Sequence, residues 1–394
     1  MKKDAHKLTA LLALLLITGC VGEAPGEVVP YDATVLVSKI PEVIEALKSG
    51  DPLEAIVALD RRRAAGDLPD GARHYQALAL QDLKRTEEAE ILWRQEITEH
   101  PGNGAAHAFL AEILIDSGTF EEAGALLDQA QRYQPGMAIS ALLRGRLARQ
   151  QGKDQDAVRH YNDFLMLEPF EARAIEAHRA IGQIMATENY DPTSAQWHEE
   201  RAAYLTRVHQ YRAVYRQRLA QRPSDVDALY GIGMTWLNLF YEISRKDQSL
   251  LEEADRWLTQ VLLLAPDHAE ALANLASIRA EQRRTEDAIA LFQRAVEIDP
   301  NEPRPHLRLG RLYLMTQKLG EAETETRAAL TASTKNQDRA MAHSQLAEIL
   351  QHSNPAGAIK NLQIYLNFEP NDPAQQRSLL EQLLKTQNRG QEDQ

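Results

Sequence analysis

The chain has 394 residues, of which 44% are hydrophobic and 26% are charged, so it can bury a core and a broadly disordered protein is excluded. Its formal net charge of -13 opposes general binding to nucleic acid, because neutralising phosphate groups needs a basic surface. It contains a single cysteine, which excludes an intramolecular disulfide framework.

Residues 1–19 have the pattern of an export signal. Lys2, Lys3 and Lys7 give a positive start, and an apolar run over 8–18 follows. The run is too short to span a bilayer, which needs about 20 residues. A basic start, a short apolar run and small residues at its end are typical of a secretory signal peptide. The alternative, a buried helix of the fold, is disfavoured because nothing amphipathic marks this run.

The signal ends in Ile17-Thr18-Gly19-Cys20, which resembles the lipobox of bacterial lipoproteins. The resemblance implies cleavage before Cys20 and attachment of acyl chains, such as palmitate, to that residue. Several acyl chains anchor a protein far more firmly than one. Val21 stands where an aspartate would retain a Gram-negative lipoprotein in the inner membrane, so the resemblance implies the outer membrane, facing the periplasm. We expect residues 20–35 to form the lipidated cysteine and a flexible tether.

From about residue 36, three classes of residue recur at an interval of 34 residues. Such a period is the signature of a solenoid of repeated units. The prolines are Pro101, Pro135, Pro169, Pro266 and Pro300. The alanines are Ala55, Ala89, Ala123, Ala157, Ala254, Ala288 and Ala322. The small residues are Ala77, Ala111, Gly145, Ala276 and Gly310.

Segment 269–302 shows the repeat unit most clearly. Its first half places Leu272 and Leu275 at helical spacing, and its second half places Ala288 and Phe292 on one stripe of a second helix. A proline then stops that helix. We expect the small residue of the first helix to allow a close approach to the alanine of the second, with large residues filling the space between units.

This unit resembles the tetratricopeptide repeat (TPR), a helix–turn–helix motif. The resemblance covers residues 36–372 and implies an all-α superhelical solenoid of about eight or nine units. It divides the chain into an N-terminal TPR array over 36–171 and a C-terminal TPR array over 226–372. The regular units are 70–103, 104–137, 138–171, 269–302 and 303–336.

Residues 172–225 fit the repeat worst, because Pro169 and Pro223 are 54 positions apart. We expect a divergent, expanded unit there, with a long helix over 196–221. Beyond residue 372, four leucines at 379, 380, 383 and 384 share one helical face, which predicts a capping helix over 373–386. We expect a disordered tail over 387–394.

Catalytic motifs are absent from the sequence. Gly231-Ile232-Gly233 begins like a dinucleotide fingerprint, but Trp236 stands in the place of the third glycine. His198-Glu199-Glu200 begins like a zinc-protease motif, but Ala202 replaces its second histidine. We therefore expect no enzyme activity, no cofactor and no metal.

An alternative remains open. Segment 172–225 departs from the repeat, and insertions often carry function. An enzyme or metal-dependent hydrolase there would require His178, His198 and nearby carboxylates to converge in space.

The TPR resemblance also implies where a partner would bind, because the first helix of each unit lines a concave groove. Asn274, Arg304 and Arg308 match, in type or charge, three positions at which some TPR proteins clamp the carboxylate of a peptide C-terminus. Tyr230 and Met234 occupy the polar positions of the first clamp unit, which weakens the match. Further basic groove positions are Arg311, Arg146 and Arg149. Solvated arginines without a binding role are the alternative reading.

Taken with the lipobox, these features favour a lipid-anchored scaffold or adaptor that binds envelope proteins or peptide segments in its groove. It would support assembly of an envelope complex of the pilus–secretin, peptidoglycan-hydrolase or polysaccharide-export type. Formation of a homo-oligomer through the capping helix stays open.

Overall fold

The structure of this protein is a computed structural model that describes residues 39–49, 51–187, 192–368 and 374–392. Over these ranges the regular elements are nineteen helices, α3 to α21, without a strand. The all-α prediction is confirmed. The predicted signal peptide, Cys20 and the tether lie outside the described residues.

The chain divides into two compact halves, with the boundary between Ala213 and Val214, inside α12. The helices up to that boundary are α3 (Pro41–Ser49), α4 (Pro52–Ala65), α5 (Ala72–Asp82), α6 (Thr86–Glu99), α7 (Gly104–Asp116), α8 (Phe120–Tyr133), α9 (Ala138–Gln150), α10 (Asp154–Leu167), α11 (Ala172–Met185) and the first part of α12 (Pro192–Gln221).

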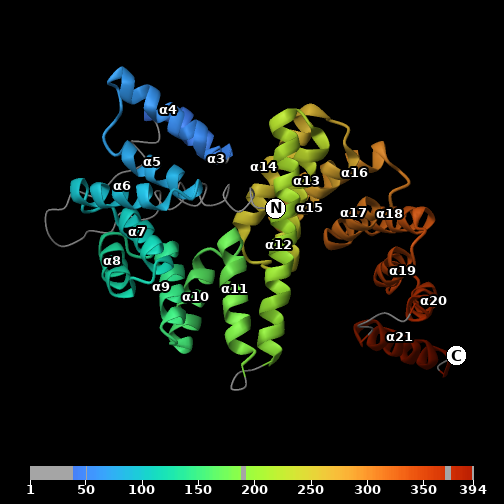
Figure 1. The fold of residues 1–394 in the computed structure, drawn as a ribbon. Coiled ribbons are helices and arrows are strands. Elements are labelled where there is room, and N and C mark those ends of the chain that lie inside the picture. The colour runs from blue at the N-terminus through green and yellow to red at the C-terminus, as the bar shows by residue number, and fades with distance from the viewer. Residues whose placement is uncertain (1–38, 50, 188–191, 369–373, 393–394) are drawn as a thin grey trace. The chain divides into compact units, whose positions relative to one another are not determined.

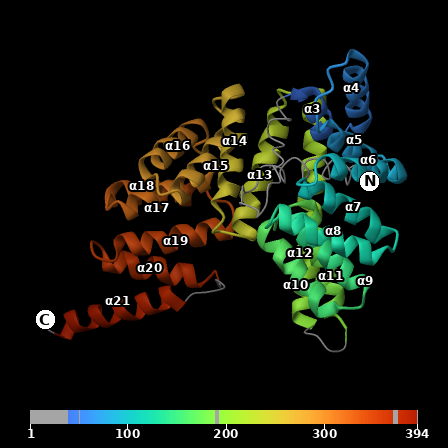
Figure 2. The same ribbon diagram turned by 90° about the vertical axis from the view of Figure 1, so that its left-hand side faces the viewer.

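The C-terminal half holds the end of α12 and a further series of helices (Figures 1 and 2). These are α13 (Val226–Glu242), α14 (Gln248–Leu264), α15 (Ala269–Glu281), α16 (Thr285–Ile298), α17 (Pro303–Met315), α18 (Leu319–Ala332), α19 (Asn336–Leu350), α20 (Pro355–Leu366) and α21 (Ala374–Glu392).

Each regular 34-residue unit is a pair of helices that pack against each other, such as α7 with α8 and α17 with α18. The recurring prolines lie just after the second helix of a pair: Pro101 follows the end of α6, and Pro300 follows the end of α16. A proline cannot continue the helix, so it ends one unit and leads into the next.

Close approach within a pair depends on the small residue of its first helix, as expected, but in α9 this residue lies nearest to Tyr161 and not to the alanine of the second helix. In α9, a Cβ atom built on Gly145 would come within 2.7 Å of Cδ1 of Tyr161 in α10. A second close approach joins neighbouring units and not the two helices of one pair: in α13, a Cβ on Gly231 would come within 2.3 Å of Cζ of Tyr215 in α12. Neither distance leaves room for a methyl group, so glycine sets the spacing of these helices.

The core runs continuously from one unit to the next in the C-terminal half. Phe292 of α16 is 1% exposed and belongs to a buried cluster with Leu309 and Tyr313 of α17 and Ile349 of α19. Burying such a ring contributes about 1.5–3 kcal/mol. Each unit therefore depends on its neighbours to cover its apolar faces, as in other solenoids.

The turn between the two helices of a regular unit has a left-handed residue at the fifteenth position of the unit. It is glycine at Gly118 (φ 83°) and Gly152 (φ 70°). It is a side-chain-bearing residue at Lys84 (φ 62°), Arg283 (φ 60°) and Gln317 (φ 61°). The left-handed region costs such residues roughly 1–2 kcal/mol, so packing imposes this turn.

The irregular unit 226–268 takes up its nine extra residues mostly in its helices. Helices α13 and α14 have 17 residues each, against 13 in α15 and 14 in α16. Segment 172–225 contains α11 and the 30-residue α12, which covers the long helix expected over 196–221.

The tail expected over 387–394 is helical in its described part, because α21 continues to Glu392. No proline interrupts this stretch, and its glutamines and glutamate are good helix formers. Leucines 379, 380 and 383 of α21 are only half-buried, and Leu384 is exposed.

Candidate functional site

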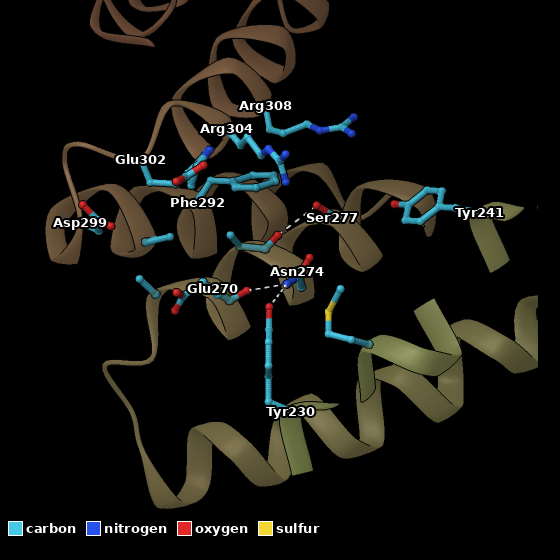
Figure 3. Close-up of a pocket in the computed structure, with 15 residues that line it drawn as sticks. Tyr230, Tyr241, Glu270, Asn274, Ser277, Phe292, Asp299, Glu302, Arg304 and Arg308 are labelled. Atoms are coloured by element: carbon cyan, nitrogen blue, oxygen red, sulfur yellow. Dashed lines mark hydrogen bonds between the residues drawn. The ribbon is translucent and has the colours of Figure 1, made fainter. Parts of the chain in front are cut away.

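Three residues singled out from the sequence meet in one cavity of the C-terminal half. Asn274 of α15 and Arg304 and Arg308 of α17 line a cavity of about 340 Å³ (Figure 3). Tyr230 and Met234 of α13 also line it. The volume is at the lower end of the roughly 300–1,000 Å³ that ligand pockets occupy.

Asn274 is held by two hydrogen bonds that Figure 3 shows as dashed lines. Its Nδ2 donates to the hydroxyl oxygen of Tyr230 at 2.9 Å and to the backbone carbonyl of Glu270 at 2.9 Å. The carbonyl can only accept, so it fixes which end of the amide is nitrogen. Both amide hydrogens are therefore used within the protein, and Oδ1 is left as an acceptor.

Tyr230 remains a neutral hydroxyl in this arrangement. Burial raises the pKa of Tyr230, and the negative charge of Glu270 raises it further, while the bond from Asn274 lowers it. Its ring also packs against His268, with ring centroids 4.9 Å apart. The tyrosine thus links α13 to α15 across two repeat units, through groups 44 residues apart in the sequence.

Arg304 and Arg308 supply the positive side of the cavity. Both are exposed, and neither guanidinium has an ion-pair partner within the described ranges. Arg308 is close enough to Tyr241 to lower the pKa of that phenol, although burial and then Glu281 raise it more strongly. Two unpaired guanidinium groups beside a cavity are suited to carboxylate or other anionic groups.

Acidic residues line another part of the same cavity. Glu270, Asp299 and Glu302 contribute to its wall, and Figure 3 shows Asp299 and Glu302 on one side with Arg308 directed to the other. The ring of Phe292 lies between these groups but is only 1% exposed, so Met234 and Ala273 supply the apolar surface that a ligand can reach. The cavity therefore has a donor side, an acceptor side and an apolar part.

Arg311 lies elsewhere, in a second cavity of about 550 Å³ formed by α17, α19 and α21. Its guanidinium pairs with Glu348 of α19. Five glutamines line this cavity: Gln317, Gln351, Gln375, Gln376 and Gln382. It is thus polar and largely uncharged, unlike the cavity around Asn274.

Arg146 and Arg149 belong to the N-terminal half and are engaged there. Arg146 donates to the buried Glu112 at 2.9 Å and pairs with Glu176. Arg173 donates to Glu112 at 3.0 Å. Burial opposes ionisation of Glu112, but the charges of Arg173 and Arg146 outweigh it and lower its pKa to about 2. Arg149 donates to Gln183, so both predicted groove arginines have internal partners.

His178 of α11 and His198 of α12 do converge, which the enzyme alternative required. Their Nδ1 atoms are 2.8 Å apart, and both side chains are buried. Two nitrogen ligands of a tetrahedral zinc ion would be roughly 3.3 Å apart, so the pair is a hydrogen bond in which one Nδ1–H donates to the other ring. No carboxylate completes a three-ligand group with them in the described part of the chain.

The group of possible metal ligands that the described residues do form lies at another place. Asp70, Glu99 and His100 bring their ligand atoms within 4.8 Å of one another. Asp70 and Glu99 are exposed, and Glu99 pairs with Arg73. Exposed acidic groups of this kind are common without an ion, so this cluster is not evidence of a metal centre.

The sequence did not reveal that Tyr230 bonds to Asn274. Tyr230 does not fit the clamp pattern in the sequence. In the structure its hydroxyl oxygen accepts a hydrogen bond from the side-chain amide of Asn274, a residue that does fit the pattern. A usable signal was present, because Tyr230 precedes Asn274 by one lengthened unit at neighbouring groove positions.

No helix among the described residues is both long and apolar enough to cross a membrane.

Comparison with known proteins identifies the repeats. Sequence models of the tetratricopeptide repeat match residues 80–147, 243–303 and 279–349. Over 125 residues the chain is 28% identical to mouse protein O-mannosyl-transferase TMTC3, a match that covers 30% of this chain and 13% of that protein. The chain thus spans only a small part of this curated relative.

Solved structures of helical-repeat proteins are also similar to this chain. A MamA variant is 18% identical, with 45% of this chain and 97% of that chain covered and a TM-score of 0.34. PilF of Pseudomonas aeruginosa is 13% identical, with 72% and 97% covered and a TM-score of 0.30. The repeat assignment itself rests on the sequence models and on the packed helix pairs.

Proposed function

We propose that this tetratricopeptide-repeat solenoid is a protein-binding scaffold that holds a segment of a partner protein in the cavity lined by Asn274. The observation that carries the proposal is the position of Arg304 and Arg308, which line that cavity without an ion-pair partner in the described structure. Met234 and Ala273, which line the same cavity and are only partly buried, offer apolar contact. The proposed role is binding, without a catalysed reaction, a metal or a cofactor.

We further propose that Cys20 carries the lipid anchor and holds the scaffold at the outer membrane, facing the periplasm. Support comes from the lipobox-like Ile17-Thr18-Gly19-Cys20 after an apolar run and from Val21 behind it. At that place the scaffold would support assembly of an envelope complex of the pilus–secretin, peptidoglycan-hydrolase or polysaccharide-export type.

The binding proposal is tested with a labelled peptide that has blocked ends and an internal aspartate. Arg304→Glu combined with Arg308→Glu should weaken its binding by about tenfold or more, since each hydrogen bond to a charged group contributes about 1.5–3 kcal/mol. Fluorescence anisotropy measures the dissociation constants.

A matched control changes the net charge equally at Arg256 and Arg339, which are exposed and lie outside the cavity. Arg256→Glu with Arg339→Glu should alter binding far less. Equal losses in the two double variants would show that only the overall charge matters, and no loss in either would remove the proposal.

The anchor is tested separately by labelling cells with palmitate and separating their membranes. The wild-type chain should take up the label and sediment with the outer membrane, and Cys20→Ala should do neither. An unlabelled wild-type chain would contradict the anchor and leave the binding proposal untouched.

A further inference from the structure

The exposed group formed by Asp70, Glu99 and His100 does not by itself indicate a metal centre, but a buried carboxylate lies directly behind its histidine. Glu96 of α6 is 0% exposed, and its Oε1 lies 3.3 Å from Nδ1 of His100. Asn103 donates to the same Oε1 at 3.0 Å and so holds the carboxylate in place. Oε2 of Glu96 is buried without a hydrogen-bond partner among the described residues. A buried carboxylate is costly without a compensating positive charge, so Glu96 is a second observation that points to a cation.

His100 lies between two carboxylates, because its other nitrogen faces Asp70. Nε2 of His100 and Oδ2 of Asp70 are 3.3 Å apart. A neutral imidazole carries one N–H hydrogen and can donate to only one of the two carboxylates. When Nδ1–H is directed to the buried Glu96, the lone pair of Nε2 faces an oxygen of Asp70. A cation between these two atoms turns a repulsive contact into an attractive one.

The spacing of these atoms suits a zinc-like ion. Two ligands of a tetrahedral zinc ion are roughly 3.3 Å apart, which is the separation of His100 Nε2 and Asp70 Oδ2. The ligand atom that Glu99 offers lies within 4.8 Å of the other two, and its exposed side chain can turn toward them. Arg73 pairs with Oε2 of Glu99. Its positive charge opposes a cation, but three carboxylates surround the site, counting Glu96.

We propose that Asp70, Glu99 and Nε2 of His100 bind a divalent transition-metal cation of the zinc class, and that Glu96 positions His100. Mixed nitrogen and oxygen ligands suit zinc, and a metal-binding histidine usually donates its other N–H group to a carboxylate or carbonyl. Water completes the coordination, because three protein ligands leave one tetrahedral position open. The site belongs to the N-terminal half, so it goes beyond the proposed binding function and does not depend on it.

The ion joins the two ends of one repeat unit. Asp70 comes just before α5, Glu99 is the last residue of α6, and His100 follows it. Coordination therefore ties the start of the first helix to the end of the second, two helices that already pack together. An ion that binds only the folded chain raises its stability, so zinc should raise the melting temperature.

The experiment titrates zinc alone into the metal-free full chain at pH 7.5 and follows binding by isothermal titration calorimetry. His100→Gln removes the nitrogen ligand and should weaken zinc binding about tenfold or more, the loss of roughly one good interaction. Glu87→Gln is the matched control, because Glu87 is an exposed residue of α6 outside the group of ligands. It should leave the affinity unchanged, and circular dichroism should show that both variants are folded.

Glu96→Gln tests the positioning role. Glutamine has nearly the same shape and keeps an oxygen for Asn103 and His100, but it removes the charge. Zinc affinity should fall about tenfold, at the lower end of the effect of residues that orient a ligand. Cobalt(II) bound in place of zinc gives a second readout, because its visible absorption depends on ligand geometry. The spectrum should change in Glu96→Gln and stay the same in Glu87→Gln.

The results separate the parts of the proposal. Wild-type affinity no tighter than that of His100→Gln would overturn the metal site, whatever the result of the peptide-binding test. Equal affinity and equal cobalt spectra in the wild type and Glu96→Gln would overturn the positioning role. Losses in His100→Gln and Glu96→Gln that Glu87→Gln does not share support both.

Discussion

The Nδ1 atoms of His178 and His198 lie 2.8 Å apart where α11 meets α12. Only one proton fits between the two Nδ1 atoms, so one ring donates it and the other accepts. Two neutral imidazoles satisfy this arrangement. Trp197 packs edge-on against both rings, and Arg201 lies over the Trp197 ring at 5.0 Å. This surrounding favours a neutral pair and makes the contact sensitive to acid.

The histidine pair should make stability depend on pH. Burial, then the charges of His198 and Arg201, lower the pKa of His178 to about 3, and burial lowers the pKa of His198. The unfolded chain binds these protons near pH 6.5, so the pair's contribution is complete above pH 6.5. The contribution of His178 falls as the pH drops toward 3, by up to about 1.4 kcal/mol per pH unit, and the lowered pKa of His198 acts in the same direction.

Urea unfolding between pH 7.5 and pH 5 measures this effect. The double variant His178→Leu with His198→Leu should lose less stability over that range than the wild type, because both partners become apolar together. Other buried histidines, such as His74, also contribute to the slope, so the difference between the two proteins is the quantity that matters. Parallel curves would contradict the assignment.

Gly231 should tolerate no side chain. Gly231→Ala would push a methyl group into the ring of Tyr215 and should cost about 1–3 kcal/mol, in spite of alanine's better helix propensity. In Gly124→Ala the nearest atom to the new Cβ is Cδ2 of Leu147 at 3.7 Å, an ordinary contact. That control should be neutral or stabilising in thermal melts.

A second change should rescue the first. Tyr215→Ala removes the ring that the new methyl group meets, so adding Gly231→Ala to it should cost less than in the wild type. A cost that is the same in both backgrounds would mean that something other than Tyr215 limits the space.

The left-handed turn residues can be improved. Arg283→Gly and Lys84→Gly should each raise the free energy of unfolding by about 0.5–1 kcal/mol. Glycine adopts this conformation without a steric penalty, and the greater backbone entropy that glycine loses on folding offsets part of that gain. Thermal denaturation measures the gain. Gly152→Ala, at the same position of its own unit, should change stability in the opposite direction.

Glu112 should be a costly buried carboxylate to neutralise in the N-terminal half. Glu112→Gln leaves Arg146 and Arg173 without their shared buried anion and should cost about 3–5 kcal/mol. Glu99→Gln breaks an exposed pair with Arg73 and should cost no more than about 1 kcal/mol. Equal unfolding midpoints in urea for the two variants would show that the Glu112 pairs contribute little.

The wild-type contribution of Glu112 should also persist in moderate acid. Its folded pKa of about 2 lies below the ordinary value of 4.5 for a glutamate, so its stabilisation is present above pH 4.5 and is lost as the pH falls toward 2. The histidine pair begins to lose its contribution below pH 6.5, whereas Glu112 begins to lose its contribution only below pH 4.5. The two effects are therefore separable.

The repeats could be predicted from the sequence because the residues that define each 34-residue unit lie within that unit. A small residue, an alanine, a large apolar residue and a proline recur at fixed places, and each acts on residues within its own unit or the next. Gly145 against Tyr161, and Pro300 after α16, are of this local kind. The grouping of Asn274, Arg304 and Arg308 followed from the same period, because equivalent positions of adjacent units lie side by side.

The tertiary structure alone decided which of those side chains are available to a partner. Arg146 and Arg304 are both groove arginines in sequence, yet Arg146 is paired with Glu112 and Glu176, whereas Arg304 lines a cavity and has no such pair among the described residues. Likewise the hydroxyl of Tyr230 reaches Asn274 across 44 residues. Periodicity fixes the backbone path of a solenoid, but the partner of a long polar side chain depends on distances and angles between units that no local pattern encodes.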